Sequence, residues 1–208
     1  MKFSVIIPAY NAEHHIMKGL DSIRDQSFKD YELIIVCDSC EDKTEMIARK
    51  YTDKVIPIFA HNDGVARSTG LDAAQGEFVL FLDDDDWFLH EFVFEMLDDW
   101  TNNVKADVYC FGFIWKGIGF ATPTSNHGTF YPSVWNKVWR RSFIGETRFP
   151  NIYSISDYYF HCEMFKKTGG LVTAWDMPMV YYNYLRPGSI SHEMGRTIEG
   201  TIGYWENN

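Results

Sequence analysis

A buried strand that runs directly into four consecutive aspartates constrains this chain more than any other feature. The five apolar residues from Phe78 to Leu82 have the length and composition of a strand covered on both faces, and Asp83 to Asp86 follow at once. Two carboxylates about 6 Å apart repel by about 3 kcal/mol at an effective dielectric of about 20, so a half-buried acidic cluster needs a counter-ion. Carboxylate oxygens favour a divalent metal ion. The alternative is an acidic turn that is simply solvated.

The first half of the chain alternates segments of strand and helix character. Apolar runs of strand length are separated by apolar residues at helical spacing, such as Ile16, Leu20 and Ile23. This order predicts an α/β fold, a mostly parallel, Rossmann-like sheet with right-handed crossovers and flanking helices. We expect strands at 3–8, 31–37, 54–59 and 77–82, and helices at 45–48 and 65–75. The polar residues that close these strands, Asn11, Asp38 and Asp83 to Asp86, then meet at the edge where such sheets bind ligands.

The second half is less regular and richer in aromatic residues. We expect helices at 88–100, 135–141 and 157–167, and strands at 107–115, 171–175 and 179–184. The length of 208 residues fits a single domain, 1–208, in which a loose boundary at 101–106 separates a first half, 1–100, from a smaller second half, 101–208.

Charge and composition exclude several classes of partner. The formal net charge of -10 argues against a nucleic-acid backbone or an anionic membrane surface as the main partner. The sequence has no apolar stretch of membrane-spanning length and no apolar run of signal-peptide length near its start, which predicts a soluble, cytoplasmic protein. The four cysteines are too few and too scattered for a disulfide scaffold, and the CxxC at Cys37 and Cys40 lacks the partners of a zinc site.

The sequence lacks the glycine-rich loops that commonly neutralise the phosphate groups of a bound nucleotide. The sequence contains neither a GxGxxG after the first strand nor a GxxxxGK[ST]. On a segment that we expect to be extended, Asp83 and Asp85 point the same way and Asp84 points the opposite way. One carboxylate can then hold a cation while another meets a sugar hydroxyl. This arrangement suits a nucleoside diphosphate whose pyrophosphate is bridged by Mn²⁺ or Mg²⁺.

Four motifs in order along the chain resemble those of the family 2 glycosyltransferases of GT-A fold. The family pattern is a strand ending in PxYN, a D-x-S-x-D-x-T loop, an ARNxG helix and a GEYxxFLDxDD block. The matching segments are VIIPAYN at 5–11, DSCEDKT at 38–44, ARSTG at 66–70 and GEFVLFLDDDD at 76–86. WNKVWRR at 135–141 and YNYLRPGSIS at 182–191 also match common family stretches. The resemblance therefore covers most of the chain.

The resemblance implies a metal-dependent transfer of a hexose from a nucleotide sugar, with UDP as the expected nucleotide, to a hydroxyl of a glycan or glycoprotein. Residues 1–100 would bind the donor and 101–208 the acceptor. Asp38 would accept a hydrogen bond from the uracil N–H, Asp83 would bind the ribose, and Asp157 would be the general base of an inverting, single-displacement reaction. The implied donor-site residues are Pro8, Tyr10, Asn11, Asp38, Arg67, Asp83 and Asp84, and the candidate ligands of Mn²⁺ or Mg²⁺ are Asp85 and His192.

The acceptor half departs from the family pattern. Ser156 stands where the family usually has Glu, so Glu163 and Asp176 remain rival bases. Cys37 and Cys40 stand where the family often has Asp and Ser, which makes the CxxC a variant nucleotide loop.

Each assignment also has a purely structural alternative. Asp38 can cap a turn, Arg67 can be an exposed helix charge, and Asp157 can be a helix N-cap. Trp87 and Trp135 are candidate platforms for an acceptor ring. The competing functions are a non-catalytic nucleotide-sugar or carbohydrate-binding module on the same fold and a sugar nucleotidyltransferase, although the latter usually needs a basic, glycine-rich N-terminal loop. A phosphatase with an Asp nucleophile fits less well, because Trp87 follows Asp86 without the expected Thr or Val.

Overall fold

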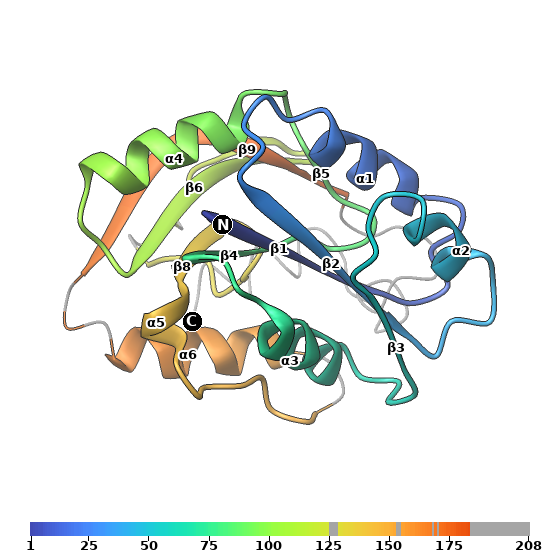
Figure 1. Cartoon of the computed structure of the whole chain (residues 1–208). Helices are drawn as coiled ribbons and strands as arrows, with labels where there is room; N and C mark the ends of the chain where they lie inside the picture. Colours follow the sequence, from blue (N-terminus) through green and yellow to red (C-terminus); the bar gives the residue numbers. More distant parts are fainter. Residues whose placement is uncertain (125–128, 153–154, 168, 170, 184–208) are drawn as a thin grey trace.

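The fold is built on one long mixed β-sheet with helices on both faces (Figure 1). The computed structural model describes residues 1–124, 129–152, 155–167, 169 and 171–183. The strands of the sheet lie in the order β3-β2-β1-β4-β8-β6-β9-β5, and β7 pairs with β6. No helix within these residues is both long and apolar enough to cross a membrane.

The first half forms the expected parallel sheet. Its strands are β1 (Phe3–Ala9), β2 (Tyr31–Asp38), β3 (Val55–Ile58) and β4 (Phe78–Phe81). Register pairs place Ile6 beside Ile34 and Phe81, so β1 lies between β2 and β4. The connecting helices are α1 (Ile16–Arg24), α2 (Thr44–Ala48) and α3 (Asp63–Ala73). The carboxyl ends of β1, β2 and β4 therefore lie at one edge, as the sequence predicts.

The second half is mostly antiparallel to its neighbours, so the sheet as a whole is mixed rather than mostly parallel. Its elements are β5 (Trp87–Phe88), α4 (Val93–Asn103), β6 (Val108–Trp115), β7 (Gly119–Ala121), β8 (Lys137–Arg140), α5 (Arg141–Ile144), α6 (Ser156–Lys167) and β9 (Val172–Tyr182). β8 is antiparallel to both β4 and β6, and it joins the two halves.

Three predictions for the second half are wrong. The segment 135–141 contains strand β8 rather than a helix, because it is drawn into the gap between β4 and β6. The helix predicted at 88–100 begins at Val93, because Trp87 and Phe88 pair with β9. The strands predicted at 171–175 and 179–184 are one strand, β9, which shifts register opposite Gly112.

Alternating side chains divide the core into two layers. Phe3, Val5 and Ile7 of β1 pack with buried residues of α1 and α4 on one face of the sheet. Ile6 of the same strand packs with buried residues of α3 and α6, such as Phe160, on the other face. Figure 1 shows α1, α2 and α4 on one side and α3, α5 and α6 on the other. This is the pattern expected of strands covered on both faces.

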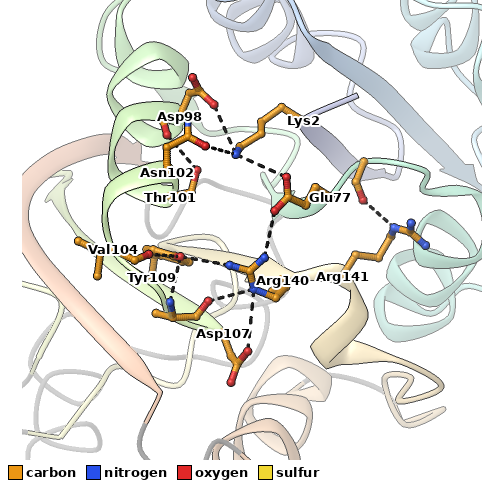
Figure 2. Close-up of polar contacts among 12 residues, drawn as sticks. Lys2, Glu77, Asp98, Thr101, Asn102, Val104, Asp107, Tyr109, Arg140 and Arg141 are labelled. Atoms are coloured by element: carbon orange, nitrogen blue, oxygen red, sulfur yellow. Dashed lines mark hydrogen bonds and ion pairs between the residues drawn. The ribbon is translucent and has the colours of Figure 1, made fainter.

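A charged network joins the halves at the amino-terminal end of β4, away from the aspartate block (Figure 2). Lys2 donates to Asn102 of α4 at 2.7 Å and pairs with Glu77 at 3.5 Å. Arg140 of β8 also pairs with Glu77, at 3.0 Å, and its Nε donates to the Ala106 carbonyl at 3.1 Å. These contacts fix β8 against β4 and β6. They lie at the end of β4 opposite to the one that the aspartate block follows.

Candidate active site

The aspartate block forms a tight turn, named here the acid turn (residues 83–86). The N–H of Asp86 donates to the carbonyl of Asp83 at 3.1 Å. The expectation that Asp83 and Asp85 share one face of an extended segment is therefore wrong, because the chain reverses at Asp84 and Asp85. The turn presents the carboxylates of Asp83, Asp84 and Asp86 to different neighbours.

Asp83 is paired with a buried arginine. Nη2 of Arg67 lies 2.7 Å from Oδ1 of Asp83, and Nη1 pairs with Asp63 at the start of α3. Arg67 is only 7% exposed, and its Nε has no partner among the described residues. Burial raises the pKa of Asp83, although Arg67 opposes that shift. The guanidinium therefore faces carboxylates, and its implied place among the donor-site residues stays a prediction.

Asp84 ties the acid turn to the loop after β1. Its Oδ2 accepts the backbone N–H of Tyr10 at 3.2 Å, and its Oδ1 lies 3.3 Å from Nε2 of His15. The ring of Tyr10 is 54% exposed beside this contact, with His61 in an edge-on arrangement at 5.9 Å. Sequence reasoning missed His15 as the partner of Asp84. The exposed Tyr10 ring is free of the core and can stack on a base.

Asp86 is fully buried at the end of the acid turn. Its Oδ1 accepts the N–H of Asn183 at 2.8 Å, and its Oδ2 has no hydrogen-bond partner among the described residues. Burial, together with Asp85 and Asp83, raises its pKa well above the ordinary value. Tyr182, the residue before Asn183, is half-buried near the same aspartates, and desolvation and their charge raise its pKa. In the sequence, the signal for this contact is the family-like stretch YNYLRPGSIS, which begins at Tyr182.

Asp38 ends β2 and holds the next crossover. Its carboxylate accepts the backbone N–H groups of Ala60, His61 and Asn62 at 2.6 to 2.9 Å, and it also accepts the Ser39 hydroxyl. The residue is 4% exposed. Burial alone would raise its pKa, but these hydrogen bonds lower it below the ordinary value. The structural alternative for Asp38, a turn-holding role, is therefore realised, and a nucleotide contact would add to it.

Pro8 and Asn11 lie at the end of the neighbouring strand. Pro8 is half-buried within β1, and Asn11 is exposed with a positive φ of 45°. Oδ1 of Asn11 accepts the backbone N–H of Glu41 at 2.9 Å. The thiol of Cys40 donates to the Ala9 carbonyl at 3.4 Å, so a hydrogen bond from the variant CxxC loop holds that loop against β1.

Asp157 reaches the acid turn from the other half of the chain. It lies in the first turn of α6 and accepts the N–H of Tyr158 at 2.9 Å. Burial raises the pKa of Asp157, Arg67 opposes the shift, and Asp83 and Asp63 add to it. Ser156, the residue before Asp157, donates its hydroxyl to Asp63, which also pairs with Arg67, so the start of α6 lies beside this cluster. Residues far apart in sequence therefore meet at one edge of the sheet.

The rival bases lie elsewhere. Glu163 is exposed on α6 and pairs with Lys166 at 3.0 Å. Asp176 is exposed on β9, seven residues before Asn183. Seven residues of strand span on the order of 20 Å, so Asp176 is remote from the contact between Asn183 and Asp86. Of the candidate bases, the structure brings only Asp157 to the acid turn within the described residues.

The tryptophans are not free acceptor platforms. Trp135 is 6% exposed, stacks on Tyr182 with centroids 4.3 Å apart and meets Phe113 edge-on, so it is a core residue. Trp87 is half-buried and stacks on Tyr181 at 4.1 Å, and Nζ of Lys18 lies 3.1 Å from its centroid. Protein contacts therefore already occupy both indole rings.

The donor set at the acid turn fits a hard divalent ion held jointly with a ligand. The described residues contain no group of three or more His, Cys, Asp or Glu side chains arranged to hold a metal by themselves. Mg²⁺ is commonly bound by one or two carboxylates together with substrate phosphates. The half-buried Asp85, next to the unpartnered oxygen of Asp86, can supply such ligands. His192 lies outside the described residues.

Known proteins share this sequence pattern and fold. Residues 4–169 match the sequence profile of glycosyl transferase family 2. The glycosyltransferase GlyA of Streptococcus pneumoniae is 29% identical over 185 residues, which cover 84% of this chain and 24% of GlyA. The crystal structure of TarS 1–349 from Staphylococcus aureus in complex with UDP-GlcNAc superposes with a TM-score of 0.82 and 25% identity, over 95% of this chain and 62% of that one.

A more distant structure shows the same fold. Glucosyl-3-phosphoglycerate synthase from Mycobacterium tuberculosis, solved with Mn²⁺, UDP and phosphoglyceric acid, has a TM-score of 0.68 and 17% identity over 93% of this chain and 73% of that one. The chain spans less than two thirds of the length of GlyA and of the TarS fragment. The profile match covers most of the chain, which therefore belongs to glycosyl transferase family 2, a family of enzymes, and has the GT-A fold.

Proposed function

We propose that this chain transfers a hexose from a UDP-sugar to a hydroxyl of a glycan or glycoprotein, with inversion and with the help of Mn²⁺ or Mg²⁺. The observation that carries the proposal is the chain of contacts at the carboxyl edge of the sheet from Ser156, next to Asp157, through Asp63 to Arg67 and Asp83. A donor site and a candidate base then lie together. The UDP-GlcNAc complex of the TarS fragment supports a UDP-linked donor.

The donor would lie over the carboxyl ends of the parallel strands. Tyr10 offers an exposed ring for the base, beside Pro8 and Asn11. Asp38 holds the crossover loop that borders this region, and among the described residues one of its oxygens, Oδ2, accepts one hydrogen bond, from the N–H of Asn62. A carboxylate oxygen has room for a second donor, such as the N–H of a uracil ring. These residues would select and orient the nucleotide.

The acid turn would meet the sugar and diphosphate end of the donor. Asp83, oriented by Arg67, would accept a ribose hydroxyl, and Asp84 would keep the turn fixed to the Tyr10 loop. Asp85 would hold the metal ion. When bound, the ion would supply charge stabilisation to the departing diphosphate. Arg67 would act mainly by orienting Asp83.

Asp157 would take the proton from the acceptor hydroxyl. Its half-buried carboxylate has a pKa raised above the ordinary value by desolvation, which makes it a stronger base than a solvated aspartate while it stays ionised. The hydroxyl would attack the anomeric carbon on the face opposite the diphosphate. A single displacement of this kind inverts that carbon. The half comprising residues 101–208 would provide the acceptor side.

The test is a binding and turnover screen of the whole chain. UDP, GDP and TDP are added with and without Mn²⁺, and thermal unfolding and release of free nucleotide from the matching sugar donors are measured. We expect UDP with Mn²⁺ to raise the melting temperature. Asp157→Asn should keep that shift and lose turnover by about 100-fold or more, whereas Asp85→Asn should lose the metal-dependent part of the shift.

Two outcomes would contradict the proposal. If no nucleotide stabilises the chain in the presence of metal, the donor site is wrong. If UDP binds but wild-type and Asp157→Asn are equally inactive with every donor, a non-catalytic binding module describes the chain better. Asp72→Asn is the matched control, because Asp72 is an exposed aspartate of α3 that pairs with Arg148.

A further inference from the structure

One carboxylate bridges the two helices that bring Arg67 and Asp157 together. Asp63 is the first residue of α3, and its Oδ2 accepts the hydroxyl of Ser156 at 2.8 Å. The same oxygen pairs with Nη1 of Arg67. Ser156 is the first residue of α6, is fully buried and directly precedes Asp157. The amino-terminal ends of α3 and α6 are therefore joined through one atom of Asp63.

The backbone around this bridge is packed without spare room. A Cβ at Gly64 would lie 2.9 Å from Cβ of Ser156 and 2.7 Å from the carbonyl oxygen of Pro150. Both distances are too short for a real side chain, so α3 approaches α6 as closely as glycine permits. Asn62 caps α3 by accepting the N–H of Val65 at 3.0 Å. The side chain of Asp63 thus leaves a fixed helix end.

We propose that Asp63 is a positioning residue that holds the first turn of α6, and with it the Asp157 carboxylate, in the place needed for proton transfer. The inference rests on the proposed function of Asp157. A general base must lie within hydrogen-bond reach of the proton that it accepts, and misplacement by about 1 Å can cost about 100-fold in rate. A bond to the neighbouring residue of the same turn controls that placement directly.

The charge of Asp63 has a second, separable effect. Arg67 is shared between Asp63 and Asp83. The negative charge of Asp63 therefore weakens the electrostatic effect of the Arg67 guanidinium on Asp157. Asp63 and Asp83 both raise the pKa of Asp157, and Arg67 lowers it. Removing the charge of Asp63 should therefore lower the pKa of the base. Removing the hydrogen bond alone should leave that pKa where it is.

Two substitutions separate these effects. Ser156→Ala deletes the hydrogen bond and leaves every charge in place. Asp63→Asn keeps the shape and can still accept from Ser156, but it removes the charge. The control is Asp72→Asn, the same change on the same helix at an exposed position paired with Arg148.

The experiment follows release of UDP from UDP-GlcNAc with Mn²⁺ between pH 5 and pH 9, with UDP-dependent thermal shift as the measure of folding and donor binding. For Ser156→Ala we expect kcat about tenfold lower, KM for the donor within about twofold, and an unchanged pH profile. For Asp63→Asn we expect the acid limb of the kcat profile to move to lower pH by about half a unit or more. Asp72→Asn should match the wild type.

The inference and the proposed function fail in different ways. If Asp157→Asn is inactive while Ser156→Ala and Asp63→Asn keep the wild-type rate and pH profile, Asp63 does not position the base and the proposed function stands. If Asp157→Asn turns over like the wild type, the base lies elsewhere and the inference is overturned with it. A Ser156→Ala variant that binds UDP normally but loses rate supports the inference, since its donor site is intact.

Discussion

His161 offers the sharpest test of the packing on the α6 face of the sheet. This histidine lies one helical turn after Asp157, is 8% exposed and stacks on Phe165 with centroids 4.0 Å apart. Its Nδ1 has no hydrogen-bond partner among the described residues. Burial, together with the buried ammonium group of Lys137, lowers the pKa of His161 to about 2. The folded protein therefore holds this imidazole uncharged at ordinary pH.

The consequence is a loss of stability in mild acid. Between about pH 6.5, where a histidine titrates in the unfolded chain, and pH 2, the unfolded state binds a proton that the folded state does not. The free energy of unfolding then falls by about 1.4 kcal/mol for each unit by which the pH drops below 6.5. From pH 7 to pH 5 this single residue should cost about 2 kcal/mol. For a chain of this size that equals about 4 to 8 °C in melting temperature.

The perturbation is His161→Phe, which keeps a stacked ring and removes the titration. Urea unfolding of both proteins is followed at pH 7, 6 and 5, and the two free energies are subtracted, so that contributions from all other groups cancel. We expect the variant to gain about 2 kcal/mol relative to the wild type between pH 7 and pH 5. If the two curves run parallel over that range, His161 is not held neutral in the folded protein, and the reasoning is refuted.

Three further substitutions test individual side-chain environments. Glu32 accepts from Ser4 and from the N–H groups before β4 and pairs with Lys54, so Glu32→Gln should lose about 2 kcal/mol at pH 7 in urea unfolding. Since these contacts lower the pKa of Glu32, the difference from wild type should shrink as the pH falls below about 4. A Cβ at Gly70 would overlap Cγ2 of Ile6, so Gly70→Ala should cost about 1 to 3 kcal/mol in the same assay. Tyr10→Ala should weaken UDP binding about tenfold in calorimetry and leave the melting temperature unchanged, because the ring is exposed.

The parallel half of the sheet was predictable because each strand carries its own signal. In β1 the apolar side chains of Phe3, Val5 and Ile7 face α1 and α4, and Ile6 faces α3. Continuous apolar runs of this length, separated by helical spacing, admit few arrangements other than buried parallel strands. The positions of Asp38 and the acid turn follow from where those strands end. For this half, local pattern and tertiary structure agree.

The segment that contains β8 shows where local pattern fails. Trp135, Val138 and Trp139 recur at helical spacing, which predicted a helix. In the structure Val138 packs in the α1 layer and Trp139 in the α3 layer, as in a strand with two buried faces. The partner strands β4 and β6 decide this, and they lie far away in the sequence. Lys137 can be buried in this strand because its Nζ donates hydrogen bonds to the carbonyl oxygens of Tyr131 and Ser133.

The gathering of these motif residues at one edge of the sheet was predictable, but the pairings among them were not. The sequence placed Asp83 and Asp157 at the site through motifs, yet it assigned Arg67 to the nucleotide. The pairing of Arg67 with Asp63 depends on helix α3 beginning at Asp63, one turn before the arginine. The hydrogen bond that Oδ1 of Asp86 accepts comes from Asn183, almost a hundred residues later. Pairings of this kind are set by packing between elements, which no short-range spacing encodes.

The pairings also bear on why a metal ion should be needed. Among the described residues, two cations beside the acid turn are already engaged: Arg67 with Asp63 and Asp83, and Lys18 with the ring of Trp87. A diphosphate brought to this edge adds negative charge to a cluster of carboxylates, and carboxylates at close range repel strongly in a partly buried site. Because Arg67 already neutralises aspartates of the protein itself, we expect the charge of the donor to be balanced by an ion that binds together with it. Stabilisation by UDP should therefore depend steeply on the divalent ion.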